Sequence, residues 1–187
     1  MKPTLGLIFM ALLAVGGQTR AAEPLDVRLG AIEDRQAIDQ LLTGDYPRAL
    51  DLRQWPDYAA LFTADGELTF AGRTLKGPAE IEKFFNTFRV SSSTPPPRPG
   101  EIRTLHVVSN LSFRIEGDTA VGGAYWETIG VTEGRPAVLS AGRYEDVLKK
   151  EHGRWKFAKR AIVSDLAPRT TTPAPGSGTA PADPPAR

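Results

Sequence analysis

The sequence contains no cysteine and only two histidines, His106 and His152, among its 187 residues. The lack of cysteine excludes a disulfide framework, a thiolate nucleophile and a cysteine-bound metal. His106 falls in a predicted strand and His152 in a predicted turn, so the two imidazoles are not expected to converge on one metal ion. We therefore expect no metal site.

Other chemical signatures are also missing. The chain has no Gly-x-Ser-x-Gly nucleophile elbow and no glycine-rich phosphate loop, so neither serine-hydrolase chemistry nor a nucleotide cofactor is indicated. We expect no cofactor. The 23 basic and 22 acidic residues are interspersed and give a formal net charge of only +1. This balance argues against a nucleic-acid partner.

The longest apolar run lies at the amino terminus. Leu5–Val15 is apolar apart from Gly6, follows Lys2, and precedes the small residues of Thr19-Arg20-Ala21. This order is typical of a secretory signal peptide over residues 1–21, and the run is too short for a permanent membrane span. We expect a periplasmic or secreted protein with no stable membrane anchor after cleavage; the alternative is an uncleaved membrane tether.

The carboxyl-terminal segment, residues 167–187, has a different composition. Six prolines stand among Thr, Ser, Gly and Ala, with almost nothing apolar to bury. Such a segment does not offset its ordering entropy, so it is predicted to be a disordered tail. The folded domain is then expected over residues 25–166.

Helical patterns occupy the first half of this domain and strand patterns the second. Apolar residues recur at helical spacing from Leu25 to Leu42, Pro47 predicts an interruption near Asp45, and two further helices are expected near Pro56 and after Pro78. Strands are predicted over residues 67–70, 105–115, 120–131, 137–149 and 155–164. This order predicts an α+β cone, in which three amino-terminal helices pack on a curved antiparallel sheet around an internal pocket.

The strand that contains His106 has two different faces. Strict alternation places His106, Val108 and Asn110 together on a mixed face. The opposite face is apolar and consists of Leu105, Val107, Leu111 and Phe113. A solvated outer face would not need so much apolar surface, so this face is predicted to form a homodimer.

Several motifs in the right order resemble the SnoaL-like branch of the nuclear transport factor 2-like superfamily, and its scytalone-dehydratase-like members in particular. The motifs are Asp45-Tyr46-x-Arg48-Ala49-Leu50-Asp51-x-Arg53-x-Trp55, Tyr58-Ala59-Ala60-Leu61-Phe62, Leu105-His106-x-x-x-Asn110, Gly142-Arg143-Tyr144-Glu145-Asp146 and Gly153-Arg154-Trp155-Lys156-Phe157. The resemblance implies the cone-shaped fold. Because this fold carries many activities, it does not by itself define one.

The resemblance also implies a pocket in which Asp51 and His106 meet. A carboxylate beside one imidazole nitrogen fixes the tautomer and makes the other nitrogen a better base. Tyr46 is a further candidate catalytic group, as a proton donor. Five other residues are predicted to line the pocket, each with an alternative role in the core or in sheet hydrogen bonding: Trp55, Tyr58, Asn110, Trp126 and Tyr144.

Two classes of function remain open from the sequence. The first is an exported small-molecule enzyme, a lyase or isomerase of dehydratase type, that uses Asp51 and His106 for acid–base chemistry on an apolar hydroxylated or carbonyl compound. The second is a non-catalytic periplasmic module that binds a small hydrophobic molecule, or a dimeric interaction domain.

Overall fold

The computed structural model describes residues 23–87 and 102–166. The predicted signal peptide and the predicted tail therefore lie outside the described residues. Within the described ranges, no helix is both long enough and apolar enough to cross a membrane.

The amino-terminal helical segment is continuous but changes its winding. Helix α1 (Leu25–Gln40) runs into a π-helical turn, η1 (Leu41–Asp45), and then into α2 (Tyr46–Asp51). Pro47 lies in the first turn of α2 and has no amide hydrogen to donate to the preceding turn. The wider π turn just before Pro47 accommodates this missing hydrogen bond, so the interruption predicted near Asp45 is a change of winding and not a break in the helix.

A sharp break separates α2 from α3 (Trp55–Ala60), because Arg53 adopts a positive φ of 56°. Asp51 and Trp55 therefore lie on different helices, separated by the left-handed residue Arg53.

Six strands form one curved sheet in the order β2-β1-β6-β5-β4-β3. The strands are β1 (Phe62–Phe70), β2 (Arg73–Lys76), β3 (Leu105–Glu116), β4 (Thr119–Thr132), β5 (Arg135–Glu151) and β6 (Arg154–Leu166), and α4 (Gly77–Thr87) follows β2. All pairs are antiparallel except β1 with β6, which is parallel. The predicted α+β class is confirmed, with a mixed rather than a purely antiparallel sheet.

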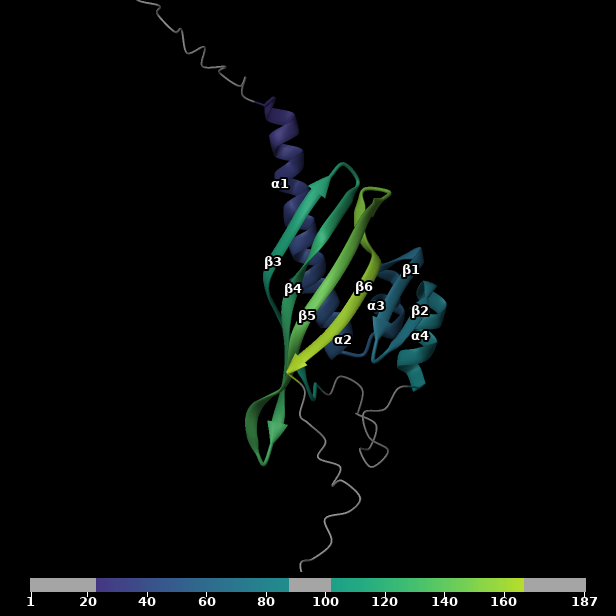
Figure 1. The fold of residues 1–187 in the computed structure, drawn as a ribbon, viewed down its shortest axis with the longest axis vertical. Coiled ribbons are helices and arrows are strands. Elements are labelled where there is room, and N and C mark those ends of the chain that lie inside the picture. Colours follow the sequence, from purple (N-terminus) through teal and green to yellow (C-terminus); the bar gives the residue numbers. More distant parts are fainter. Residues whose placement is uncertain (1–22, 88–101, 167–187) are drawn as a thin grey trace, which may run out of the picture.

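The helices cover one face of this sheet, and the other face is open (Figure 1). Helix α1 passes behind the long strands and is tied to the edge strand, because Arg35 donates to the carbonyl oxygens of Phe113 at 3.2 Å and Leu111 at 3.5 Å. Farther across the same face, the indole of Trp155 on β6 donates to Asp34 of α1 at 2.8 Å. The core therefore lies between the helices and the concave face of the sheet.

A bulge in β3 reverses its face pattern partway along. The pairing with β4 shifts between Ser109 and Ser112, and Asn110 has a φ of 53°. One extra residue moves all later side chains to the opposite face, so Leu111 and Phe113 pack against the core. The predicted apolar outer face is wrong for these two residues. Asn110 is exposed at the bulge, so its predicted place in a pocket beside His106 is also wrong.

Gly142 of β5 is held closely between two neighbours. It pairs with Trp126, and a Cβ at this position would lie 3.0 Å from the Trp126 ring and against the backbone of Val163 on β6. Gly142→Ala should therefore lower the free energy of unfolding by about 1–3 kcal/mol through overpacking. Urea denaturation measures this. Gly30→Ala is the control, because nothing lies within 4 Å of a Cβ there, and it should be neutral or slightly stabilising.

Candidate active site

Asp51 and His106 come together from α2 and β3. The His106 Nδ1 lies 2.6 Å from Asp51 Oδ1, and the His106 backbone N–H donates to both carboxylate oxygens at 3.2 Å. The His106 side chain is only 18% exposed and the Asp51 side chain only 10%. The sequence-based expectation that these residues meet agrees with this geometry; their catalytic role is a separate matter.

The edge position of β3 explains why the Asp51 carboxylate can bind the backbone of His106. Alternate N–H groups of an edge strand have no strand partner. Asp51, at the last turn of α2, accepts one of them and fixes the backbone as well as the ring of His106. Because Arg53 turns the chain back immediately afterwards, Asp51 is presented toward β3 rather than along a continuing helix.

The contact determines how the imidazole is protonated. When neutral, an imidazole that faces a carboxylate through Nδ1 carries its hydrogen on Nδ1, and its Nε2 is then an acceptor. No metal or cofactor is needed for this nitrogen to take a proton. Within the described ranges, no group of three or more His, Asp or Glu side chains is arranged to hold a metal ion.

Most of the other predicted site residues form a separate aromatic cluster. Tyr46 contacts Tyr58 and Tyr144 with ring centroids 5.3 and 5.4 Å apart, and Trp126 stacks on Tyr144 at 6.0 Å. Trp55 joins at the rim, edge-on to Tyr58 at 6.3 Å. The structure thus brings these five residues together. Tyr46 makes no hydrogen bond to His106, so the predicted proton donor belongs to this cluster.

Arg160 lies at the centre of the aromatic cluster, and sequence reasoning missed it. Its guanidinium is 4.1 Å from the centroid of Tyr46, 4.0 Å from Tyr144 and 3.9 Å from Phe157. It donates to Asp146 through Nε at 2.8 Å and Nη2 at 2.7 Å, and both side chains are fully buried. Although burial opposes its charge, the pKa of Arg160 is raised because Asp146 outweighs the desolvation.

Four polar atoms of this cluster are buried without a hydrogen-bond partner among the described residues. They are Tyr46 Oη, Tyr58 Oη, Trp126 Nε1 and Arg160 Nη1. Burial raises the pKa of Tyr58 and of Tyr144 well above the ordinary tyrosine value, so both hydroxyls keep their protons at neutral pH. The interior of the cone therefore offers several hydrogen-bond donors in apolar surroundings.

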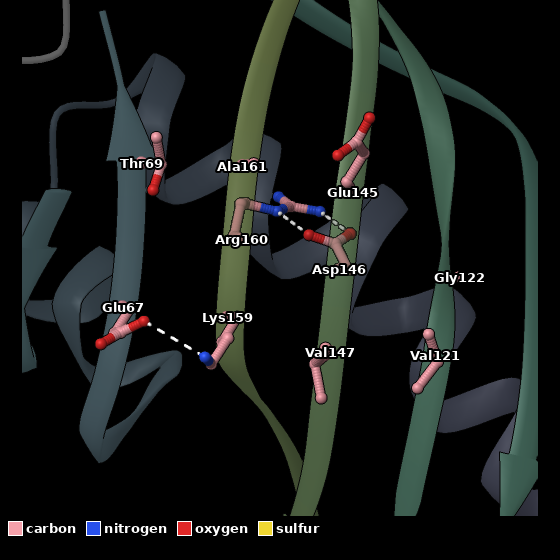
Figure 2. Close-up of a pocket in the computed structure, with 10 residues that line it drawn as sticks. All are labelled: Glu67, Thr69, Val121, Gly122, Glu145, Asp146, Val147, Lys159, Arg160 and Ala161. Carbon is pink, nitrogen blue, oxygen red and sulfur yellow. Dashed lines mark hydrogen bonds and ion pairs between the residues drawn. The ribbon is translucent and has the colours of Figure 1, made fainter. Parts of the chain in front are cut away.

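An open groove of about 380 Å³ lies on the sheet and does not include the Asp51–His106 pair. Figure 2 shows its lining across β1, β6, β5 and β4, with Glu67 paired to Lys159 at the left and Arg160 meeting Asp146 between β6 and β5. The groove is open to solvent, whereas the side chains of Asp51 and His106 are mostly buried. We therefore place the candidate active site at Asp51 and His106.

The chain belongs to the SnoaL-like domain family, whose model matches residues 30–161. Among solved structures, an NTF2-like protein with a cystatin-like fold from Novosphingobium aromaticivorans is 20% identical with a TM-score of 0.63, over 79% of this chain and 90% of that one. A candidate scytalone dehydratase from the same organism is 23% identical with a TM-score of 0.57, over 75% and 89%.

A hexachlorocyclohexane dehydrochlorinase is also similar, with 24% identity and a TM-score of 0.60 over 74% of this chain and 90% of that one. At these identities the likeness shows the fold alone. No curated protein matches the sequence. Proteins of this fold thus include an enzyme, and the activity of this chain has to be argued from its own site.

Proposed function

We propose that the protein is a cofactor-independent lyase or isomerase that takes a proton from carbon in an apolar hydroxylated or carbonyl compound. His106 is the catalytic base, and Asp51 is the positioning residue that fixes its tautomer. The observation that carries this proposal is the 2.6 Å contact between Asp51 Oδ1 and His106 Nδ1, which leaves Nε2 as the proton acceptor.

In an elimination, Nε2 of His106 removes a proton from the carbon next to the one that bears the leaving group. The electron pair of the broken C–H bond forms the new double bond, and the leaving group departs with its own bonding pair. A departing hydroxide takes the proton back from the imidazolium and leaves as water. Chloride leaves as the ion, and the imidazolium then gives its proton to water. In an isomerisation, the imidazolium returns the proton to a different carbon.

Asp51 contributes to the same step through charge. The imidazolium that forms on proton removal lies beside a carboxylate that is only 10% exposed, so the ion pair stabilises the charged state of the base. Positioned proton transfer of this kind contributes about 10²–10⁴-fold in rate. The burial of both side chains supports this use, since the attraction between charges is stronger where water is excluded.

The named relatives support elimination as the reaction class. A dehydratase removes water and a dehydrochlorinase removes hydrogen chloride, and both reactions need a base at the carbon adjacent to a leaving group. Tyr46 is not used in this proposal, because its hydroxyl lies in the aromatic cluster and not at the imidazole.

His106→Gln tests the proposal, because glutamine keeps a polar side chain but has no titrating nitrogen. The purified protein is incubated with apolar β-hydroxy ketones, chlorinated cycloalkanes and β,γ-unsaturated ketones in deuterated buffer, and the products are followed by mass spectrometry. We expect turnover by the wild type and a loss of about 10²–10⁴-fold in His106→Gln.

His152→Gln is the matched control, because it makes the same change at the exposed turn histidine and should leave turnover unchanged. A His106→Gln variant that stays folded and keeps full activity would contradict acid–base catalysis by this residue. Binding of the test compounds without turnover or deuterium exchange would instead favour the non-catalytic binding module.

A further inference from the structure

The amino-terminal half of α1 stands apart from the rest of the domain. Its first turns extend past the end of the sheet (Figure 1), and residues 25–29 are exposed all round the helix. The helix has no side-chain hydrogen bond at its amino-terminal cap. A helical segment as short as this half of α1 is marginal in water on its own, so the segment needs a packing partner to remain helical.

An apolar stripe runs along the outer side of this half. Leu25, Leu29 and Ile32 follow one another at spacings of four and three residues and are 76%, 52% and 61% exposed. The side that faces the domain is the opposite one, since Asp34 bonds to Trp155 and Ile38 is fully buried. Each residue turns the helix by about 100°, so the centre of the apolar stripe and the centre of the side that carries Asp34 and Ile38 are about 170° apart around the helix axis. The stripe is thus free to accept a second helix.

The charges beside the stripe have opposite signs on its two flanks. Asp26 and Glu33 follow the apolar positions Leu25 and Ile32 on one flank, and Arg28 and Arg35 lie on the other. In a two-stranded coiled coil with Leu25 and Ile32 at d and Leu29 at a, the acidic residues occupy e and the basic residues occupy g.

We infer that a second copy of this chain packs on the stripe, with the two α1 helices parallel about a two-fold axis. In that arrangement a g residue faces the e residue five positions later in the other chain, so Arg28 of each copy faces Glu33 of the other. An antiparallel pair would instead place acidic beside acidic and basic beside basic flank residues. Charge complementarity therefore selects both the occupant and its direction.

This surface replaces the one expected from the sequence. The apolar face of β3 loses Leu111 and Phe113 to the core, which leaves Leu105 and Val107 as its exposed apolar residues. On α1, by contrast, Leu25, Leu29 and Ile32 are regularly spaced on one side of the helix and have matched charges beside them; Val27, also exposed, lies outside this stripe.

Sedimentation velocity of the purified protein at tens of micromolar tests the inference. We expect a dimer, and Leu29→Glu or Ile32→Glu should raise the dissociation constant about tenfold or more, because each removes an apolar contact and adds like charges near the axis. Val138→Glu is the control: it makes the same kind of change at a residue that is 59% exposed on β5 and should leave the dimer intact.

Charge exchange separates the two helix directions. Arg28→Glu or Glu33→Arg alone should weaken a parallel dimer, and the double exchange should restore it. The same single changes would strengthen an antiparallel pair. Because the chain has no cysteine, Leu25→Cys should also form a disulfide between copies on oxidation, since parallel helices bring the two Leu25 positions together and an antiparallel pair centred on Leu29 separates them.

Wild-type protein that is folded but strictly monomeric at this concentration would overturn the inference. So would a dimer that is insensitive to Leu29→Glu and Ile32→Glu, because the contact would then be on another surface. Strengthening by the single charge exchanges would overturn the parallel direction. Circular dichroism of each variant confirms that the domain is still folded.

Discussion

Replacing Asp51 by asparagine should lower turnover about 10²–10⁴-fold, nearly as much as His106→Gln, while the fold stays intact. The carbonyl of asparagine still accepts the His106 backbone N–H, which Asp51 binds at 3.2 Å. Its amide group, however, donates to Nδ1. The imidazole then carries its hydrogen on Nε2, so the nitrogen that faces the substrate is no longer a base.

Two measurements separate this positioning role from a purely structural one. Long-range ¹H–¹⁵N correlation spectra report which nitrogen of His106 is protonated, and thermal denaturation reports stability. We expect the proton to move to Nε2 with little change in melting temperature. Asp57→Asn, an exposed aspartate in the first turn of α3, is the control and should change neither. Full activity in Asp51→Asn with the tautomer switched would exclude His106 as the base.

Arg160→Met should lower the free energy of unfolding by about 3–5 kcal/mol, the largest effect on stability that we expect. The substitution removes one partner of a fully buried pair and leaves the Asp146 carboxylate without a countercharge. It also removes the cation that lies about 4 Å from three aromatic rings. Since domains of this size are stable by only about 5–15 kcal/mol, a large share of the total would be lost.

A double-mutant cycle tests whether the unpaired charge is the cause. Arg160→Met combined with Asp146→Leu removes both charges, so the double variant should be less destabilised than the sum of the single changes. Arg143→Met removes an arginine from an exposed ion pair with Glu145 and should leave the urea midpoint nearly unchanged. An Arg160→Met midpoint equal to that of Arg143→Met would contradict this account.

The positions of helices and strands could be predicted from the sequence because their signals are local. Pro47 marks the change of winding after α1, and Gly117, Gly134 and Gly153 lie in the turns that join the long strands. The meeting of Asp51 with His106 could be predicted as well. That prediction came from the resemblance of motifs and not from spacing, because 55 residues separate the two positions.

For β3 and β6, the sequence does not predict which side chains along the whole strand face the core. In β3 the bulge at Asn110 turns Leu111 inward, and in β6 the register shifts between Phe157 and Lys159, which turns Arg160 inward. Alternation has a period of two residues, so one extra residue inverts all later positions. No local signal in either strand reports the extra residue, and for this reason the buried Arg160–Asp146 pair was missed.

The parallel pairing of β1 with β6 has a consequence for the order of folding. Strand β6, the last described element of the chain, lies between β1 and β5 and is the only strand that joins the β1–β2 hairpin to the β5–β4–β3 meander. Until β6 is in place, the sheet is two separate pieces, each with an unpaired edge. A growing or truncated chain that ends before Arg154 therefore has no complete core. Collapse to the native cone must wait for contacts between residues 95 positions apart, such as Phe62 with Phe157.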